Sequence, residues 1–515
     1  MFQRERMPKN SRFLYDESKV SGTSDYIIMP KTEDEVREVM RVNNSKGNKI
    51  TIRGLGTGLC GGCVPSGEAV MTTEFIQSSV SLGKDDRGYY LRVPASMAVG
   101  EIDRILSGDM SNVLEDTAGL VESLKAEKTG YFYPVDPTEL GGSIGGNVAT
   151  NASGPRTYRY GPTRDWVRGL HVVFADGSLL KIKRGEIKAD GRRMNFFVGR
   201  NYYSFDIPSY DSVDGIKSAV GPRIYEDMDL IDLFIGSEGI FGTITEVEVY
   251  LAPRKETYSC ILFFPTDSDA LETIKEIRSD EVLDPEFMEY MDCGSIDLIR
   301  RLISSDPYRL CIPQIPEGYG SALFIDLSAD SFVRDCRIID GLMRKHHSSI
   351  DNSWCGVDDK DYRRMRSMRH AIPSSIFEYV SSLKKEMPKI HKMGTDMSVP
   401  DGSIDEMMDY YTSSLKESGL EYVIFGHMGN NHPHVEIILK DMDDFEKATE
   451  LYDRFAAKVI SLGGSPSAEH GIGKIKTDYY PMMYGEKAVE ELTRVKRILD
   501  VKMILNPGDL IGVVR

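Results

Sequence analysis

The sequence predicts an α+β protein of two domains, and three observations carry this prediction. Its 515 residues exceed the size of one ordinary hydrophobic core, so two domains are expected, and the length also allows three. Hydrophobic residues make up 41% of the chain and charged residues 28%, which is typical of a globular protein. Helix and strand patterns are mixed in the first half, and the pattern changes after Pro253.

The first predicted elements lie between Thr32 and Arg53. Thr32 and Glu35 have the spacing of a capping box, so a helix is predicted over residues 32–44, with Gly47 beyond its end. A short strand over residues 49–53 runs into RGLGTGLCGG, where six of ten positions are glycine or threonine. Such a loop lets another molecule approach its backbone closely. Further strands are predicted over residues 89–93 and 170–175.

The region after Pro253 predicts a second α+β domain with an antiparallel sheet, because strands and charged helices are interleaved there. The predicted strands are 258–264, 322–327, 422–425 and 435–439, and the predicted helices include 268–277 and 443–462. The final stretch, KMILNPGDLIG from Lys502, returns to turn residues.

The charge and hydropathy of the chain argue against a nucleic-acid partner and predict where the protein is located. Lysine and arginine number 63 against 80 acidic residues, and the resulting charge of -17 repels phosphate backbones, so nucleic acid is not an expected partner. No apolar run approaches bilayer length, and the polar opening MFQRERMPKNSR lacks the apolar stretch of a secretory signal, so a cytoplasmic location is expected.

The cysteines predict a reducing compartment, since their number is odd and their spacing is not that of a disulfide framework. Cys60 and Cys63 form a CxxC pair without a second pair, and are interpreted as small residues in a tight loop rather than as a metal or redox site. The other five are Cys260, Cys293, Cys311, Cys336 and Cys355.

The glycine-rich loop after residue 53 matches GxGxxG through Gly56, Gly58 and Gly61, but its context excludes a Rossmann site. A Rossmann fingerprint must open a helix, and CGGCVPSGEA holds three glycines and a proline where that helix belongs. A Walker loop is excluded because no GK is followed by Ser or Thr. What remains is an irregular nest of backbone N–H groups beside Arg53 that can hold two phosphates, or, alternatively, a flexible surface turn.

Two further glycine-rich segments follow, GGSIGGNVATNASGP at 141–155 and GSEGIFGTITEVEVYLAP at 236–253. In this order the three segments resemble the PCMH-type FAD-binding domain of the vanillyl-alcohol oxidase superfamily. The closest resemblance is to the branch of glycolate oxidases, D-lactate dehydrogenases and D-2-hydroxyglutarate dehydrogenases. The resemblance implies a two-subdomain FAD-binding domain over 1–253, a substrate cap over 254–485, and a return of 486–515 to the first domain.

By the same resemblance, the first loop cradles the FAD pyrophosphate, the second segment lies along the cofactor, and the third, including Ser237 and Gly239, approaches the adenine and ribose. LNPGDLI resembles the closing motif. Residues 53–62 contain no histidine, so FAD is expected to be non-covalent. The implied FAD-binding residues are Arg53, Gly54, Gly56, Thr57, Gly58, Gly62, Gly145, Gly146, Ala149, Asn151, Gly154, Glu238, Gly242, Ile244 and Asn506.

A histidine cluster marks the second domain, because three of the nine histidines fall within HMGNNHPH. Apolar runs on both sides of its Gly and Asn residues predict a hairpin that brings His427 opposite His434, with His432, His434 and Glu436 on one strand face. Two imidazoles plus a carboxylate with an open position form a catalytic zinc-type ligand set. The alternative for any single histidine is a hydrogen-bonded structural residue.

HMGNNHPH and SAEHGIG also resemble the metal motifs of the same branch. The resemblance implies that His427, His434 and Glu469 bind a divalent metal, with Zn²⁺ as the first candidate, and that His470 is the base. RHAIP resembles the segment that supplies a substrate-binding arginine, which falls on Arg369, with Arg366 as the fallback. The departures are Asn430 for Asp, Pro433 for Leu and Glu436 for Asn, and the roles of His432 and Glu436 stay open.

The function implied by the resemblance is that of an FAD-dependent 2-hydroxyacid dehydrogenase acting on a D-lactate or glycolate type of substrate. His470 takes the hydroxyl proton, the metal chelates the substrate, Arg369 holds its carboxylate, and hydride passes from C2 to flavin N5. Electrons then leave to a separate acceptor, such as an electron-transfer flavoprotein, a quinone or an iron-sulfur subunit. A homodimer is an open option. The alternatives are a flavin oxidase, an ether-lipid-type synthase, a metal-dependent hydrolase without flavin, and a non-catalytic electron-transfer subunit.

Overall fold

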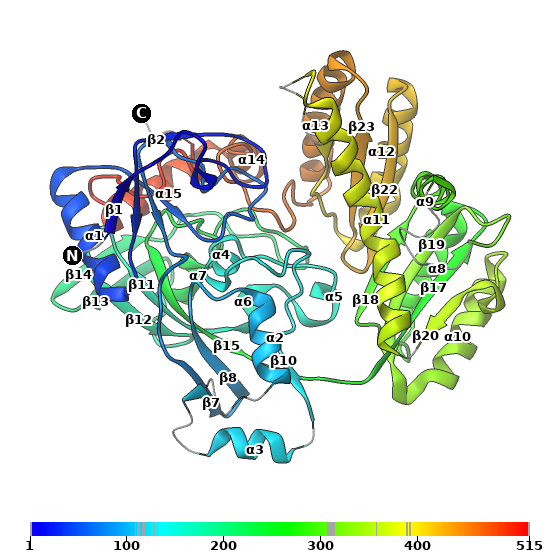
Figure 1. Ribbon diagram of the computed structural model, residues 1–515, viewed down its shortest axis with the longest axis horizontal. Helices are drawn as coiled ribbons and strands as arrows, with labels where there is room; N and C mark the ends of the chain where they lie inside the picture. Colours follow the sequence, from blue (N-terminus) through cyan, green and yellow to red (C-terminus); the bar gives the residue numbers. More distant parts are fainter. Residues whose placement is uncertain are drawn as a thin grey trace.

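The computed structural model describes residues 3–108, 110, 114–115, 119–127, 129–305, 315–356, 358–387, 390 and 393–512. Figure 1 shows two bodies: a first domain that contains both ends of the chain, and a second domain, the cap, drawn in green to orange. The chain passes into the cap after β16 (Ala252–Pro253) and returns so that α14 (Tyr479–Tyr484) and α15 (Glu486–Leu499) lie in the first domain again (Figure 1).

The first domain contains two main sheets. The four-stranded sheet has parallel pairs at β3–β6 and β4–β6, and the six-stranded sheet is antiparallel except for β7–β9. The strand order of the four-stranded sheet is β1 (Gln3–Arg6), β3 (Tyr26–Met29), β6 (Ala69–Thr72) and β4 (Ile50–Arg53). The strand order of the six-stranded sheet is β12 (Leu179–Lys183), β11 (Val167–Val173), β15 (Thr243–Tyr250), β8 (Gly88–Pro94), β7 (Val80–Asp85) and β9 (Leu114–Glu115).

The first predicted helix forms where the capping residues place it. It is α1 (Glu33–Lys46), in which the Thr32 side chain accepts a hydrogen bond from the Glu35 N–H, and Gly47 ends the helix with φ +68°. Its buried residues Val36, Val39 and Met40 pack in a core cluster with Ile50 of β4. This packing sets the direction in which β4 delivers the first glycine-rich loop.

The second glycine-rich segment contains a short helix, α4 (Ile144–Thr150), which the sequence pattern did not predict. The Ser143 side chain caps it by accepting a hydrogen bond from Gly146 N–H at 3.2 Å, and Asn151 ends it in the left-handed conformation. The glycines inside it allow close packing, because a Cβ on Gly145 would lie 2.7 Å from the Ala95 side chain.

The cap is built on a seven-stranded sheet in which all strand pairs of the described residues are antiparallel, as predicted. Its strand order is β20 (Trp354–Gly356), β17 (Thr257–Phe264), β19 (Ser321–Ser328), β18 (Phe287–Met291), β22 (Glu421–His427), β23 (His432–Ile438) and β21 (Met393–Gly394).

Helices cover both faces of the cap sheet, because the side chains of its central strands alternate between two cores. Ile261 and Phe263 of β17 pack in one core with residues of α9 and α11, whereas Leu262 and Phe264 pack in another with residues of α8 and α10. The cap helices are α8 (Asp267–Ser279), α9 (Cys293–Ser305), α10 (Phe332–Lys345), α11 (Asp359–Leu383), α12 (Ile404–Ser418) and α13 (Met442–Ser461).

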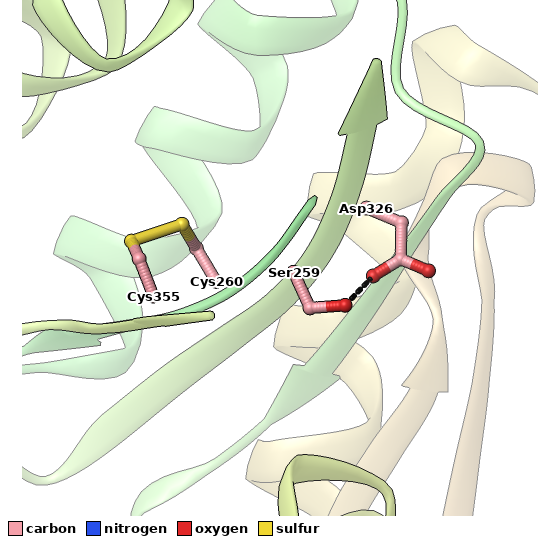
Figure 2. Close-up of a disulfide and its surroundings, with 4 residues drawn as sticks. All are labelled: Ser259, Cys260, Asp326 and Cys355. Carbon is pink, nitrogen blue, oxygen red and sulfur yellow. Dashed lines mark hydrogen bonds between the residues drawn. A yellow bond between two sulfur atoms is a disulfide. The ribbon is translucent and has the colours of Figure 1, made fainter. Parts of the chain in front are cut away.

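The cap contains a disulfide, although the spacing of the cysteines is not that of a disulfide framework. Figure 2 shows Cys260 of β17 bonded to Cys355 of β20, beside the hydrogen bond from Ser259 to Asp326. The two cysteines are 95 residues apart in sequence but lie directly opposite each other in the β17–β20 ladder. Sequence spacing could not reveal this pairing, because register between distant strands decides it. Cys311 lies outside the described residues.

The C-terminal segment contacts the first domain at several points. The backbone of Lys474 donates to Cys60, and Ile50 forms a β-bridge with Leu505. The buried Lys496 of α15 donates to the carbonyl of Ile240 in the third glycine-rich segment. Among the described residues, no helix has both the length and the apolar character needed to cross a lipid bilayer.

Candidate active site

The first glycine-rich loop, residues 53–62, is called the glycine cradle below. Gly56 has φ +75°, and a Cβ there would overlap the Arg53 guanidinium, so the turn itself requires glycine. Gly58 is different, because a Cβ there would meet only Asp16 Oδ2, at 3.8 Å. The chain's own packing therefore does not require glycine at position 58. The open backbone fits a phosphate-bearing cofactor whose oxygens come close to the N–H groups.

The structure brings the other predicted cofactor segments to this cradle. A Cβ on Gly54 would lie 2.7 Å from Ser143 Oγ, at the start of α4. The carbonyl of Ala149 accepts a hydrogen bond from Glu238 N–H at 2.7 Å, which joins the second segment to the third. Asn506 donates to the carbonyl of Glu238 and accepts from Ile52 N–H, each at 2.6 Å. Four segments that are far apart in sequence therefore meet in one place.

Several predicted FAD-binding residues have roles within the protein itself. A Cβ on Gly154 would overlap the Asp136 carbonyl, and one on Gly242 would lie 2.5 Å from Val172. Ile244 is buried in β15. Asn151 accepts a hydrogen bond from Arg164 N–H, and the buried Arg53 donates to the Tyr15 carbonyl. Gly146 N–H donates to Ser143, and Thr57 Oγ1 lies 3.1 Å from the position of a Cβ on Gly142.

Buried carboxyl groups lie close to the glycine cradle. A Cβ on Gly62 would lie 3.2 Å from both oxygens of Asp509 and 3.5 Å from Glu238 Oε2. Burial raises the pKa of Glu238 to about 7, and burial together with Glu238 raises the pKa of Asp509 well above its usual range. Protonation of this pair reduces the negative charge that a cofactor phosphate would meet.

The predicted hairpin forms from β22 and β23, but its register differs from the prediction. His427 lies opposite His432, and His434 lies opposite Phe425. The turn contains a short 3-10 helix, Met428–Asn430, and the partner of His427 lies two residues earlier than predicted. His427 and His434 are still close, with ring centroids 5.3 Å apart. The hairpin therefore brings three imidazoles together instead of two.

Two overlapping groups of ligand-type side chains occur among the described residues. His427, His432, His434 and Glu469 form the histidine cluster, and Asp396, Glu469 and His470 form the second group. In each group one ligand atom per residue lies within 4.8 Å of the others. His427 Nε2 and His432 Nδ1 are buried and have no hydrogen-bond partner in the described part of the chain. Unpaired buried nitrogens turned toward a carboxylate fit a divalent metal ion.

Oxygen acceptors outside the cluster orient its histidines. Glu289 of β18 lies opposite His427 in the sheet and accepts from its Nδ1. The carbonyl of Thr395 lies 2.9 Å from His434 Nδ1. These contacts leave the Nε2 atoms facing Glu469, at 3.5 Å for His427 and 3.7 Å for His434. Metal-binding histidines are commonly held in this way by groups behind them.

Glu469 and His470 are held in place by Asp396, which sequence reasoning did not single out. Its buried carboxylate accepts hydrogen bonds from the backbone N–H groups of Glu469 and His470, each at 3.0 Å. It also accepts from Ser467 and Lys476. Burial alone would raise its pKa, but His470 and Lys476 lower the pKa of Asp396 well below its usual range. The loop that carries Glu469 is therefore fixed by an ionised carboxylate.

Lys217 is a second residue that sequence reasoning missed. It belongs to the first domain, and its side chain is only 1% exposed. Its ammonium group lies 2.7 Å from Glu469 Oε2 and donates to the carbonyl of Gly154. The cation therefore links the second glycine-rich segment to the histidine cluster. No motif surrounds Lys217 in the sequence, so only the fold identifies it.

The charges around the cluster set the protonation states of its members. Burial opposes ionisation of Glu469, but Lys217 and His427 lower its pKa well below the usual range. Burial and Lys217 lower the pKa of His432 to about 4, and burial and His432 lower the pKa of His434 well below its usual range. His432 and His434 are therefore neutral near neutral pH, which is the form that binds metal ions.

His470 and Arg369 both have partners within the protein. His470 Nδ1 lies 3.3 Å from Asp396 Oδ2 and its Nε2 lies 3.5 Å from Glu469 Oε1, so both of its ring nitrogens face carboxylate oxygens. Arg369 of α11 places its Nε 3.2 Å from Glu289 Oε2. Burial alone would raise the pKa of Glu289, but Arg369 and His427 lower it to about 2. The fallback, Arg366, contacts His370.

A cavity of about 420 Å³ lies between the two domains beside this cluster. Its lining includes Asn151 and Lys217 from the first domain, and Arg278 and Asn430 from the cap. A small charged molecule entering between the domains would therefore meet polar side chains.

The glycine cradle, the domain order and the sheet topology define an FAD-linked oxidoreductase. The chain belongs to the family of FAD linked oxidases with the C-terminal domain, whose family model matches residues 253–510, and an FAD binding domain model matches residues 24–111 and 117–183. These matches confirm the predicted family, the α+β fold and the use of FAD by an enzyme.

Relatives extend over almost the whole chain. A D-lactate dehydrogenase from Anaerostipes hadrus is 25% identical over 507 residues, which is 97% of this chain and 93% of the relative. Glycolate oxidase subunit GlcD from Bacillus subtilis (strain 168) is 25% identical, with coverage of 97% and 91%. D-2-hydroxyglutarate dehydrogenase from Stutzerimonas stutzeri (strain A1501) is 25% identical, with coverage of 94% and 90%. A solved structure of alkyldihydroxyacetonephosphate synthase shares the fold, with a TM-score of 0.58 at 14% identity over 95% of this chain and 77% of that one.

Proposed function

We propose that this enzyme oxidises a D-2-hydroxy acid of the D-lactate or glycolate type to the 2-oxo acid, with non-covalent FAD and a divalent metal ion at the histidine cluster. The observation that carries the proposal is that two buried imidazole nitrogens facing Glu469, His427 Nε2 and His432 Nδ1, have no hydrogen-bond partner among the described residues. Three relatives are named for D-lactate, glycolate and D-2-hydroxyglutarate, and these names support the substrate class.

The reaction removes two hydrogens from the substrate, one from the hydroxyl group and one from C2. FAD, when bound, supplies the acceptor for the electron pair of the C2–H bond. A divalent ion, when bound by His427, His434 and Glu469, supplies a Lewis acid that lowers the pKa of the substrate hydroxyl. The two electrons then leave to a separate acceptor, such as an electron-transfer flavoprotein, a quinone or an iron-sulfur subunit.

His470 is the proposed base for the hydroxyl proton. It is the most exposed of the histidines around Glu469, with 29% of its side chain accessible. Asp396 contacts its Nδ1, so a proton taken up on Nε2 would produce an imidazolium beside a buried carboxylate that stabilises it. Asp396 is a positioning residue in this scheme.

Arg369 is the proposed partner of the substrate carboxylate. A guanidinium has five N–H donors, so its contact with Glu289 through Nε does not exhaust it. The same contact orients Glu289, which in turn orients His427. We therefore expect Arg369→Lys to weaken both substrate binding and the placement of His427, because an ammonium group cannot reproduce the planar fork.

The test is an anaerobic flavin-bleaching screen with D-lactate, L-lactate, glycolate, malate and 2-hydroxyglutarate. We expect D-lactate or glycolate to bleach the flavin fastest, a chelator to stop the bleaching, and an added divalent metal ion to restore it. Failure of every 2-hydroxy acid to bleach the flavin would contradict the substrate class. Bleaching that continues unchanged in a metal-free protein would contradict the metal.

A further inference from the structure

His432 is the most deeply buried member of the histidine cluster and has no role in the function proposed above. Its side chain is 0% exposed, and its ring lies 4.4 Å from that of His434 and 5.3 Å from that of His427, measured between centroids. A histidine buried this far from water needs partners for both ring nitrogens. The positions of those partners indicate what it does.

The environment of His432 repeats that of the two proposed ligands with the nitrogens exchanged. Its Nε2 lies 3.2 Å from Asp396 Oδ1, just as Nδ1 of His427 faces Glu289 and Nδ1 of His434 faces the Thr395 carbonyl. Its Nδ1 is turned to the inside of the cluster, 4.0 Å from Glu469 Oε2. All three rings therefore have an oxygen acceptor behind them and their other nitrogen toward Glu469.

A purely structural role does not account for this arrangement. A structural histidine would use its ring nitrogens in hydrogen bonds, whereas neither nitrogen of His432 has a hydrogen-bond partner among the described residues. Nε2 at least lies 3.2 Å from an oxygen of Asp396, but Nδ1 has no oxygen this close in the described part of the chain and faces the inside of the cluster. The ammonium group of Lys217 is a donor, but its hydrogen bonds go to Glu469 and to the carbonyl of Gly154 rather than to this nitrogen. A cation that accepts the lone pair of Nδ1 would satisfy it.

We propose that His432 binds the metal through Nδ1, so that the site has three imidazoles and one carboxylate as protein ligands. This inference rests on the proposed function only in assuming a metal at the histidine cluster. Asp396 is the residue that orients His432, and because the same carboxylate contacts His470 and the loop of Glu469, it couples the ligand to the proposed base.

The additional ligand bears on which ion the site takes. A catalytic zinc ion commonly has three protein ligands and an open position. Four protein ligands and the two oxygens of a chelating 2-hydroxy acid make six donors, and ions such as Mn²⁺ or Co²⁺ accept six donors more readily than zinc does. We therefore expect the site to retain Mn²⁺ or Co²⁺ in a six-donor complex with substrate.

The test counts imidazoles on the bound metal and needs no activity measurement. X-ray absorption spectra of the Co²⁺-loaded and Zn²⁺-loaded full-length protein report the number of imidazole ligands. We expect three in the unmodified protein and two in His432→Asn, which keeps a polar group beside Asp396. We also expect His432→Asn to lower Co²⁺ affinity at least tenfold in a chelator competition, since even residues behind ligands cost tenfold or more. His346→Gln, a histidine in the cap outside the cluster, is the matched control and should keep three imidazoles.

The outcomes separate this inference from the function on which it rests. Two imidazoles in the unmodified protein would overturn the role of His432 while leaving the metal and the proposed function standing. A protein that binds neither ion would overturn both, and the bleaching screen would then show oxidation that does not depend on metal. If His432→Asn does not fold, the count in the unmodified protein still decides the question.

Discussion

Around the glycine cradle the backbone is open, and a Cβ at position 58 would meet only Asp16 among the described residues. Around Glu469, in contrast, five ionisable side chains from the same part of the chain lie within 4.0 Å of its carboxylate oxygens. The cradle depends on missing side chains, and the cluster depends on side chains held by others. A cradle can therefore be recognised from glycine positions alone. A cluster of this kind cannot be recognised from local sequence, because its supporting residues come from β18, from the segment after β21 and from the first domain.

This difference predicts that metal binding and FAD binding can be lost independently of each other. Substitutions of the metal ligands should have the largest effect on activity. His427→Ala or His434→Ala removes one imidazole ligand, so metal affinity and activity should fall steeply while FAD stays bound. Elemental analysis and the flavin spectrum of the same sample measure both. Full metal content in either variant would return these histidines to a structural role.

The reciprocal experiment is Gly58→Leu, which should abolish flavin retention while the metal stays bound. A leucine there has room in the protein but would occupy the space through which a phosphate approaches the backbone. Gly341→Leu is the matched control, because Gly341 lies on α10 of the cap with nothing within 4 Å of a Cβ. A yellow Gly58→Leu protein would show that the cradle does not hold the cofactor.

His470→Ala should keep both the metal and the flavin, because His470 belongs to neither proposed ligand set. We expect the rate of anaerobic flavin reduction to fall roughly a hundredfold to ten-thousandfold, which is the usual contribution of a positioned acid or base. Stopped-flow measurement with saturating substrate would report it. A rate close to that of the unmodified enzyme would assign the proton to another group.

Lys217→Met sharpens the comparison, because this residue connects the two sites. Removing one partner of a buried ion pair leaves Glu469 uncompensated and should cost about 3–5 kcal/mol of unfolding free energy in the metal-free protein. A bound divalent ion would replace the missing positive charge, so added metal should restore most of the loss. Denaturant unfolding with and without metal measures both the loss of unfolding free energy and its restoration. An unfolding free energy that is insensitive to metal would contradict this account.

The smallest expected effect concerns the cap alone. Cys355→Ser opens a disulfide that spans 95 residues and should lower the unfolding free energy of the cap by about 2–4 kcal/mol. Flavin content should not change, since the cradle lies in the first domain. Cys336→Ser, which removes a free cysteine, is the control. Equal stability of the two variants would show that the disulfide contributes nothing.

Local sequence patterns predicted the local elements well. Thr32, Glu35 and Gly47 located α1 because capping depends on residues only a few positions apart. The glycines of residues 53–62 indicated a cofactor loop because only backbone without side chains serves that purpose. The hairpin of residues 421–438 was predicted from its alternation, but its register was wrong, because the turn is tighter than expected and pairs His427 with His432.

What the sequence determined by itself is the set of short-range features: the caps, the glycine cradle, the hairpin with its three histidines, and the family that these motifs resemble. What only the tertiary structure decided is which distant groups complete them. Glu289, Asp396 and Lys217 carry no local signal, yet they orient His427, fix the loop of Glu469 and neutralise its charge. The Cys260–Cys355 pair likewise depends on strand register. The physical reason is that periodicity and backbone conformation act over a few residues, whereas burial brings together charges from any part of the chain and forces them to pair.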